Sequence, residues 1–262
     1  VNQYSDFAAS IEKGDLDADF NPLSNEDVLG NSLLDMRDSL KRAGIEEEKR
    51  RLENERRNRA NEGYTMFSEL MRKGSDDIYE LSYSIISNLV SYINVIQGGI
   101  FILNDDNEQD VFLELSASVA YDRRKYTKKR INIGDGLVGA CAYEKEKIFI
   151  KNIPENYAEI RSGLGTAQPT SLLIVPLLME DNLIGIIELA SLQIIDDFDI
   201  EFVEKVSESI AASLYATKIN ARTSQLQDEY DKLLQEIDSL NLTLVDREKD
   251  IKQLKRKITV LQ

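Results

Sequence analysis

The side chains that most often carry out catalysis are scarce in this sequence. It has no histidine and a single cysteine, Cys141, which lies between Ala140 and Ala142. A lone thiol without an imidazole partner has no neighbouring base to activate it as a nucleophile. Cys141 is therefore predicted to be a small apolar core residue. The acidic residues are scattered along the sequence rather than paired. We expect no catalytic residue, no metal site and no cofactor.

Three closely spaced glycines, Gly134, Gly136 and Gly139, invite comparison with a phosphate-binding loop. A P-loop has Lys and then Ser or Thr after its last glycine. Ala140 and Cys141 stand there instead. The glycines are better explained by a turn into a helix, because glycine adopts backbone conformations that other residues avoid.

Composition and charge exclude several classes of protein. The 262 residues carry a formal net charge of -15, whereas nucleic-acid binding needs clustered positive charge, so no nucleic-acid partner is expected. One cysteine rules out an intrachain disulfide and fits a reducing compartment. The longest apolar run, near residues 171–179, is too short to cross a bilayer, and no secretory signal opens the sequence. Because the chain starts at Val1 and stops within a repeat, we expect a piece of a longer protein.

The clearest structural pattern is a pair of apolar runs at residues 172–179 and 183–190. They flank the polar tripeptide Glu180-Asp181-Asn182. This pattern predicts two antiparallel strands joined by a tight turn. Both runs are apolar on both faces, so the sheet is expected to be covered on each side.

The elements before this hairpin complete a recognisable order. A helix is predicted from the capping segment 75–77 to about Tyr92, followed by strands at 98–104 and 111–121. With the glycine-rich segment and the "lhxVPL" and "xxIGhhxLxS" strands of the hairpin, this order resembles the GAF domain, a small-molecule sensing and dimerisation module of signalling proteins. The resemblance covers residues 75–220. It implies an α+β fold with an antiparallel sheet covered by helices.

The resemblance also implies where a ligand would bind. In the family, the ligand lies between the sheet and the segments that precede the strand at Ser171. The candidate ligand-binding residues are Phe101, Tyr121, Val138, Tyr157, Ile160, Thr166 and Thr170. The alternative is that these side chains fill the core of a domain that binds nothing. Cyclic nucleotides are not supported, because Ala190-Ser191 replaces the Asn-Lys pair of cyclic-nucleotide-binding members.

Residues 1–43 are predicted to form two amphipathic helices joined by an ordered connector, since apolar residues recur at steps of three and four. The connector has Leu16 two residues after Gly14, and Phe20 four residues further on. With Glu26 before the second helix, it is similar to the HAMP domain, a helical coupler next to the membrane in bacterial receptors. The resemblance implies signal-relay roles for Leu16, Phe20 and Glu26. The alternative is an ordinary helical hairpin.

Two further helical segments are predicted. Within the linker 44–74, residues 45–62 are almost all charged, with Glu and Arg or Lys three and four positions apart, which indicates a solvated helix. A second helix should run unbroken from about Asp199, because neither glycine nor proline follows it. Its last part, residues 221–262, repeats apolar residues at alternating steps of four and three. Leucine at d and mostly β-branched residues at a favour a parallel two-stranded coiled coil. The seam residues are Leu226, Tyr230, Leu233, Ile237, Leu240, Leu244, Ile251, Leu254, Ile258 and Leu261.

Arg247 occupies the one seam position that lacks an apolar residue. A charge there would weaken the coil locally and suit a switch between two packings, so a signal-relay role is expected. The alternatives are a register-setting residue or a side chain that snorkels to solvent.

These features together predict the cytoplasmic part of a bacterial membrane receptor, at the inner membrane. Its parts would be a HAMP-like coupler (1–43), a charged linker (44–74), a GAF domain (75–220) and a coiled coil (221–262). We expect a homodimer, a small-molecule ligand in the GAF pocket and a downstream effector domain, with the membrane reached only through a segment outside this sequence. Two other functions stay open, a soluble GAF-fold enzyme with a helical tail and an inert coiled-coil scaffold.

Overall fold

The computed structural model describes residues 2–24, 26–120, 123–124, 129–151, 153, 160–162 and 165–260. The chain forms two compact units, residues 1–63 and 64–262. One long helix, α2 (Val28–Lys73), begins in the first unit and ends in the second. Among the described residues, none of the helices combines the length and apolar character needed to cross a membrane.

The first unit is held by a small aromatic cluster between α1 (Asn2–Glu12) and the connector that leads to α2. Phe7, Ile11 and Phe20 are buried, and the rings of Phe7 and Phe20 stack with centroids 4.4 Å apart. Leu16 packs against the same cluster. The connector residues predicted to be ordered are therefore anchored by the apolar face of α1.

Asp27 caps α2 and ties it to α1. Its carboxylate accepts hydrogen bonds from the Tyr4 hydroxyl (2.5 Å) and from the backbone N–H groups of Leu23 and Gly30 (both 2.9 Å). The hydrogen bond from Tyr4, followed by those from Gly30 and Leu23, lowers the pKa of Asp27. A Cβ on Gly30 would lie 2.5 Å from the carboxylate, so glycine is needed for this close approach. Glu26, the predicted relay residue, is exposed beside it.

The charged stretch predicted as a linker is part of α2, which continues through Gly44 and Gly63. Arg51 lies 2.6 Å from Glu48 and 3.9 Å from Glu55, at spacings of three and four residues. Such pairs support an exposed helix by a few tenths of a kcal/mol each, so roughly 0.3 kcal/mol per pair. The prediction of a solvated helix is confirmed for residues 45–62. Phe67, within the predicted linker 44–74, is instead completely buried in the core of the second unit.

The second unit is built around an antiparallel sheet. In the part of the chain that the structure describes, its strand order is β3-β2-β1-β9-β8-β5, and β4 also pairs with β2. The strands are β1 (Gln97–Asn104), β2 (Phe112–Ala120), β3 (Arg123–Arg124), β4 (Arg130–Asn132), β5 (Ile148–Lys151), β8 (Ser171–Met179) and β9 (Asn182–Ser191). A separate ladder joins β6 (Ile160–Ser162) to β7 (Gly165–Ala167). The predicted hairpin of two apolar strands is confirmed as β8 and β9, which pair from Ser171 opposite Ser191 to Met179 opposite Asn182.

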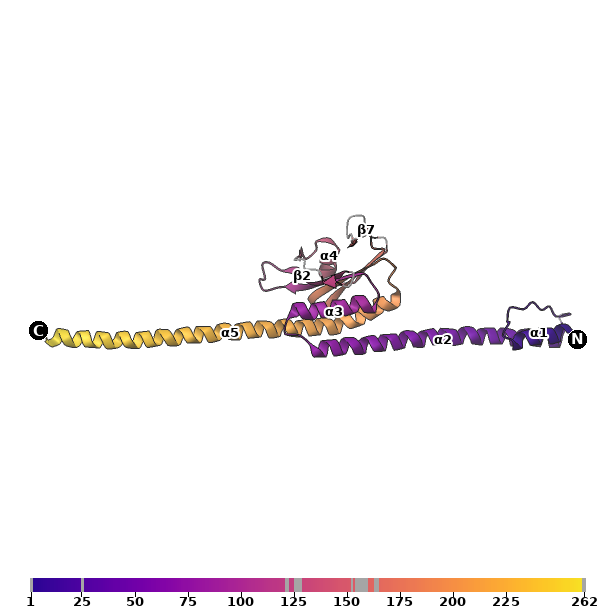
Figure 1. Ribbon diagram of the computed structural model, residues 1–262, viewed down its shortest axis with the longest axis horizontal. Helices are drawn as coiled ribbons and strands as arrows, with labels where there is room; N and C mark the ends of the chain where they lie inside the picture. Colours follow the sequence, from indigo (N-terminus) through magenta and orange to yellow (C-terminus); the bar gives the residue numbers. More distant parts are fainter. Residues whose placement is uncertain are drawn as a thin grey trace. The chain divides into compact units, whose positions relative to one another are not determined.

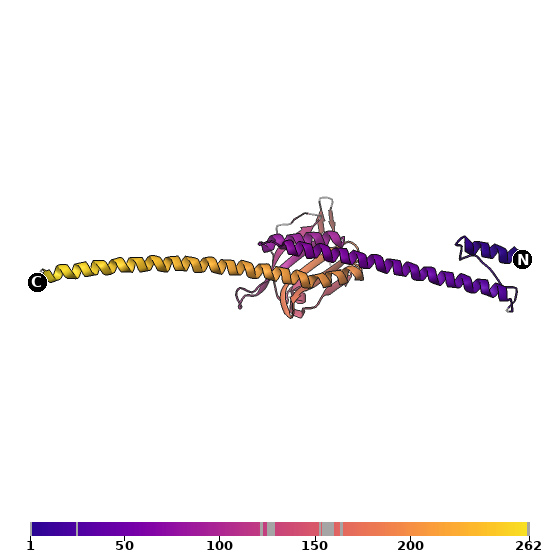
Figure 2. The same cartoon turned by 90° about the horizontal axis from the view of Figure 1, so that it is seen from below.

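Helices cover both faces of this sheet, as its apolar strands predicted. On one face lie α3 (Ile78–Tyr92) and the first part of α5 (Asp197–Val260), side by side in Figures 1 and 2. Asp77 caps α3 by accepting a 2.8 Å hydrogen bond from the N–H of Tyr79. On the other face lies α4 (Gly136–Glu144), which appears above the sheet in Figure 1. The core therefore has two layers, one on each side of the sheet.

The predicted turn into α4 is confirmed by the backbone. Gly134 and Gly136 have φ values of +91° and +63°, which non-glycine residues seldom adopt. A Cβ on Gly139 would lie 2.5 Å from the carbonyl oxygen of Asn132. These glycines thus allow a tight turn and close packing of α4 on the end of β4.

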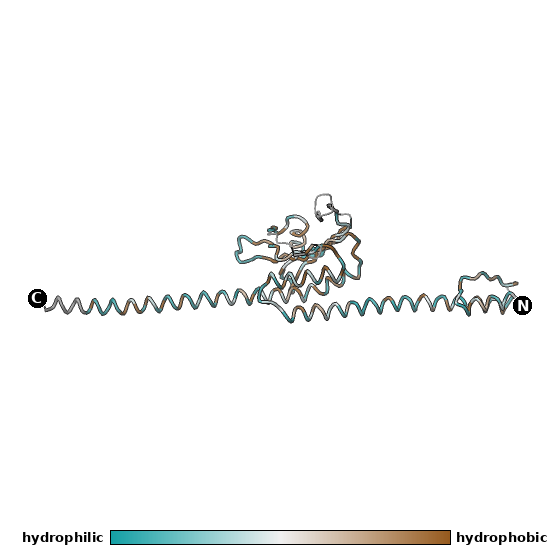
Figure 3. The backbone as a smooth tube through the Cα atoms, viewed as in Figure 1, coloured by the Kyte–Doolittle hydropathy of each residue, from teal (hydrophilic) through white to brown (hydrophobic). Residues whose placement is uncertain are grey.

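α5 is a single helix of 64 residues, in agreement with the prediction of an unbroken helix. Its first part packs in the core through residues such as Phe202, Ile210 and Leu214. Every described side chain from Ile219 to Lys252 is exposed. Figure 3 shows hydrophobic residues recurring between hydrophilic ones along this exposed part.

Candidate functional site

The candidate ligand site is a cavity of about 210 Å³ on the face of the sheet that α4 covers. Its apolar walls come from three neighbouring strands, with Phe101 of β1, Leu115 of β2 and Ala190 of β9. Gly99 forms part of the floor, where a Cβ would lie 3.4 Å from Leu115. The absence of a side chain at Gly99 thus leaves the space open.

Polar groups converge on this cavity from separate strands. Gln97, Ser118, Lys129 and Glu188 all line it. The Oε1 atom of Gln97 is buried and accepts no hydrogen bond from the described residues. A buried acceptor without a donor costs free energy, of order 1–3 kcal/mol. The Nζ atom of Lys129 lies 5.9 Å from the centre of the Phe101 ring. The cavity therefore offers an acceptor, a cation, a carboxylate and an aromatic ring to a ligand.

Strand register brings these groups together. In the antiparallel pair β1–β9, Gln97 is opposite Ala190 and Gly99 is opposite Glu188. Directly opposite residues point to the same face of a sheet. Glu188 is the only charged residue within β9. A single carboxylate in an otherwise apolar strand could therefore have indicated a functional residue from the sequence. Gln97 and Lys129 carried no comparable signal.

The predicted ligand residues occupy different places. Phe101 lines the cavity, whereas Val138 is buried in the layer between α4 and the sheet. Thr170 is exposed immediately before β8, and its hydroxyl donates a 2.9 Å hydrogen bond to the carbonyl of Leu192. Ile160 and Thr166 are backbone members of the β6–β7 ladder.

The remaining predicted ligand residues, Tyr121 and Tyr157, lie outside the described residues, as do the side chains of Ile160 and Thr166. Their participation stays a prediction. Phe101 is thus the one predicted residue that the described part of the chain brings to the cavity wall.

Cys141 lies in α4 and is fully buried, as predicted. Its thiol donates a 3.1 Å hydrogen bond to the carbonyl of Glu146. Burial, with a smaller contribution from the charge of Glu144, raises the pKa of the thiol to about 12. The thiol therefore stays protonated at neutral pH and has little nucleophilic character. No group of three or more Cys, Asp or Glu residues that could hold a metal ion occurs among the described residues.

The exposed part of α5 presents the predicted seam residues to solvent. Leu226 and Leu244 are each 59% exposed, and Ile237 is 51% exposed. Tyr230, Leu233, Leu240 and Ile251 are exposed to a similar degree. Leu254 and Ile258 belong to the helix, but their side chains lie outside the described residues, as does Leu261. Arg247 is exposed within this stripe.

Comparison with known proteins agrees with this architecture. The model of the GAF domain family matches residues 75–214. Similar solved structures include the GAF domain of an Acinetobacter phosphoenolpyruvate-protein phosphotransferase, at 16% identity and a TM-score of 0.47, covering 61% of this chain and 96% of that chain. Free methionine-R-sulfoxide reductase from Neisseria meningitidis matches at 14% identity and a TM-score of 0.45, covering 60% of this chain and 89% of that one.

The GAF domain of a two-component sensor histidine kinase from Bacillus halodurans matches at 17% identity and a TM-score of 0.40, covering 52% of this chain and 94% of that chain. No curated protein matches the chain.

Proposed function

The chain belongs to the GAF domain family, and from this premise we propose that it is the sensor and relay part of a bacterial receptor. It binds a small molecule on the α4 face of its sheet and transmits the change along a two-stranded coil to an effector. The observation that carries this proposal is that α5 is one continuous helix. Before Lys218 its apolar side chains lie in the core of the domain, and after Lys218 they form an exposed stripe.

The occupant proposed for the exposed stripe is a second copy of this chain. Half-exposed Leu and Ile side chains gain roughly 1–2 kcal/mol each when they are buried. Leu233 and Leu240 at d with Ile237 at a are the residues that favour a parallel pair.

A small-molecule ligand is supported by the polar lining of the α4-side cavity. A cavity that served only as core would gain nothing from a buried Gln97 acceptor that has no donor among the described residues. Lys129 and Glu188 offer charges of opposite sign to the same space. We therefore propose a small polar ligand with at least one hydrogen-bond donor.

The receptor context completes the proposal. The HAMP-like unit would receive a signal through a membrane segment of the full-length receptor, on the cytoplasmic side of the bacterial inner membrane. Its α2 carries an exposed apolar stripe that includes Leu29, Met36 and Leu40, which a dimeric coupler would bury. A relay of this kind needs two packings that differ by only a few kcal/mol. Arg247 in the seam suits this requirement.

Sedimentation equilibrium of the chain at micromolar concentration tests the dimer. Twice the chain mass is expected. The double substitution Leu233→Asp and Leu240→Asp should give a monomer, because it places charges in the seam. Leu242→Asp is the matched control, since Leu242 is 70% exposed at an outer f position and should leave the dimer intact. A monomeric parent chain would overturn this part of the proposal.

Thermal-shift screening against a metabolite library tests the ligand. A compound that binds only the folded state raises the melting temperature in proportion to its affinity and concentration. Stabilisation that is lost in Gln97→Ala and Glu188→Gln variants would support sensing at this cavity. Turnover of a compound would support the alternative of a GAF-fold enzyme. If no compound stabilises the chain and none is turned over, the alternative of an inert scaffold is supported.

A further inference from the structure

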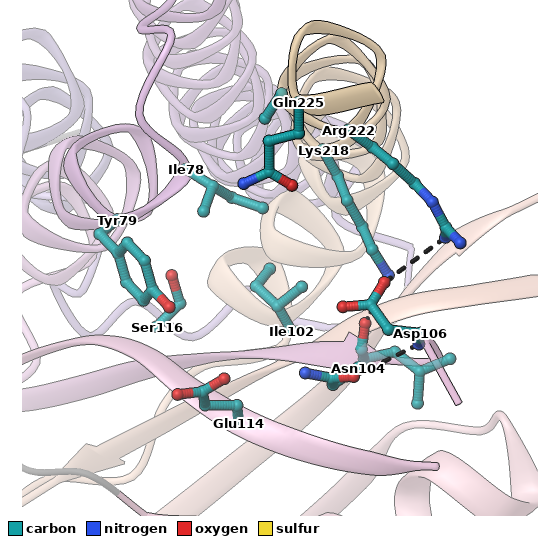
Figure 4. Close-up of a pocket in the computed structure, with 12 residues that line it drawn as sticks. Ile78, Tyr79, Ile102, Asn104, Asp106, Glu114, Ser116, Lys218, Arg222 and Gln225 are labelled. Carbon is teal, nitrogen blue, oxygen red and sulfur yellow. Dashed lines mark hydrogen bonds and ion pairs between the residues drawn. The ribbon is translucent and has the colours of Figure 1, made fainter. Parts of the chain in front are cut away.

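A second cavity lies on the opposite, helix-covered face of the sheet. It has a volume of about 260 Å³ and is shown in Figure 4. Its lining comes from the start of α3, from β1 and β2, and from the point at which α5 leaves the sheet. It shares no lining residue with the α4-side cavity. Whatever occupies it would touch both the sheet and α5.

The basic side chains of this cavity are already neutralised. Lys218 donates hydrogen bonds to the Leu103 carbonyl (2.7 Å) and to the Asp105 carboxylate (2.5 Å). Arg222 lies 3.4 Å from the Asp106 carboxylate. Figure 4 shows Arg222 and Asp106 on one side of the cavity, away from Glu114. That side therefore carries no net charge.

Glu114, on the other side, is a carboxylate that forms no ion pair with the described residues. It is half-buried on β2, and no basic side chain of the described residues pairs with it. Arg130 is opposite it in the β2–β4 register, but the guanidinium of Arg130 binds Asp110 and lies 3.8 Å from the centre of the Phe112 ring. A partly buried carboxylate without a counter-ion is costly.

The neighbours of Glu114 suit an organic cation. Figure 4 shows the Tyr79 ring and Ser116 beside it, with Ile102 between this group and Asn104. The pKa of the Tyr79 hydroxyl is raised, first by burial and then by the negative charge of Glu114. The aromatic ring and carboxylate attract an ammonium group. Ile78 and Ile102 offer apolar contact, and the amides of Asn104 and Gln225 offer neutral hydrogen bonds.

We propose that this cavity is a second ligand site, specific for small organic amines with an apolar body and a neutral polar end. Glu114 binds the ammonium group, Ile78 and Ile102 contact the body, and Asn104 and Gln225 hydrogen-bond to the neutral end. Because residues 218–225 of α5 form one wall, binding here links the sheet to the base of the exposed stripe.

Three compounds of one shape test the proposal on the unchanged chain. 4-(Aminomethyl)benzamide is the cation, 4-(hydroxymethyl)benzamide is neutral and 4-carbamoylbenzoate is the anion. Affinity is measured by nuclear magnetic resonance titration at neutral pH. The amine is expected to bind with a Kd of about 0.1–5 mM, typical for a compound of this size, and at least tenfold more tightly than the alcohol or the acid. Equal binding of the three, or no binding of the amine, overturns the proposal.

Variants locate the site. Glu114→Gln should weaken binding of the amine at least tenfold and leave the alcohol unaffected. Glu201→Gln removes the same charge from an exposed position of α5 and should change nothing. Glu188→Gln alters the α4-side cavity and should also leave amine binding unchanged. If Glu188→Gln abolishes binding while Glu114→Gln does not, the amine binds in the other cavity and this inference is wrong.

Discussion

The two parts of α5 have the same kind of amphipathic sequence but opposite surroundings. Ile210 and Leu214, in the first part, are completely buried against the sheet, whereas Leu240 and Leu244, in the second, are 57% and 59% exposed. Both parts form one uninterrupted helix. Helix formation here does not depend on which partner covers the apolar face.

The width of the apolar face separates the two parts. In the first part adjacent residues such as Phe202 and Val203, or Ile210 and Ala211, are buried together. A sheet is a broad surface and can cover such a wide stripe. In the second part most apolar residues recur at a and d positions, a narrow stripe that is typical of a coiled coil, and Leu234, Leu242 and Val245 are the exceptions. The comparison teaches that stripe width indicates the kind of partner a helix needs.

The largest effect should come from the buried part. Phe202 contacts the rings of Tyr64, Phe67 and Tyr92, with centroids 5.1, 5.9 and 4.5 Å away. Phe202→Ala leaves a cavity and should lower the free energy of unfolding of the domain by about 3–5 kcal/mol. Urea denaturation followed by circular dichroism measures it. Glu201→Ala, at an exposed position of the same helix, should cost no more than about 0.5 kcal/mol. If both variants lost a similar amount of unfolding free energy, the buried and exposed faces of this part of α5 would not differ as described.

The exposed part should respond in the opposite direction to a gain of apolar surface. Arg247→Leu completes the seam of the proposed coil and should stabilise it by roughly 1–3 kcal/mol, through added burial and removal of a charge that the dimer would desolvate. A higher, concentration-dependent melting temperature is expected. Lys252→Leu, at an outer b position, should give no such gain. If Arg247→Leu melts at or below the temperature of the parent chain, Arg247 is not in a seam.

The boundary between the two parts can be tested at Lys218. Its side chain is 22% exposed. Its ammonium group donates a hydrogen bond to the Leu103 carbonyl of β1 and forms an ion pair with Asp105 in the β1–β2 loop. Lys218→Met removes one charge-assisted hydrogen bond and a surface ion pair, so the domain should lose about 0.5–1.5 kcal/mol while the coil transition is unchanged. Lys205→Met, at an exposed position within the first part, serves as the control. A loss in the coil transition would place the boundary elsewhere.

A further effect should be a pH dependence confined to the domain. The pKa of Cys141 is raised from 9.0 to about 12 in the folded state. Above about pH 9 the unfolded chain loses this proton and the folded chain keeps it, so the contribution of Cys141 to stability is full below pH 9 and is lost as pH rises towards 12. Cys141→Ala should lack this decline. The difference in unfolding free energy between the two proteins, measured from pH 8 to 11, should narrow with rising pH. A constant difference would contradict the burial of the thiol.

The local elements were predictable because their signals lie within short stretches of sequence. The β8–β9 hairpin, the Asp77 cap of α3 and the unbroken α5 follow from residues a few positions apart. The first unit shows the limit of such reasoning. Glu26 was singled out, but its neighbour Asp27 holds α1, the connector and α2 together. Nothing near Asp27 revealed that Tyr4 would reach it.

The sequence by itself determined the types of element, the two-sided burial of the sheet and the a and d pattern of α5, because periodicity depends only on the chain's own repeat. The tertiary structure alone decided which polar groups share a cavity. Gln97 and Glu188 are 91 positions apart and meet the same space only through the β1–β9 register. Glu114 and Gln225 line one cavity only because α5 returns across the sheet. Sites of this kind depend on contacts between distant segments, and these are set when the whole domain packs.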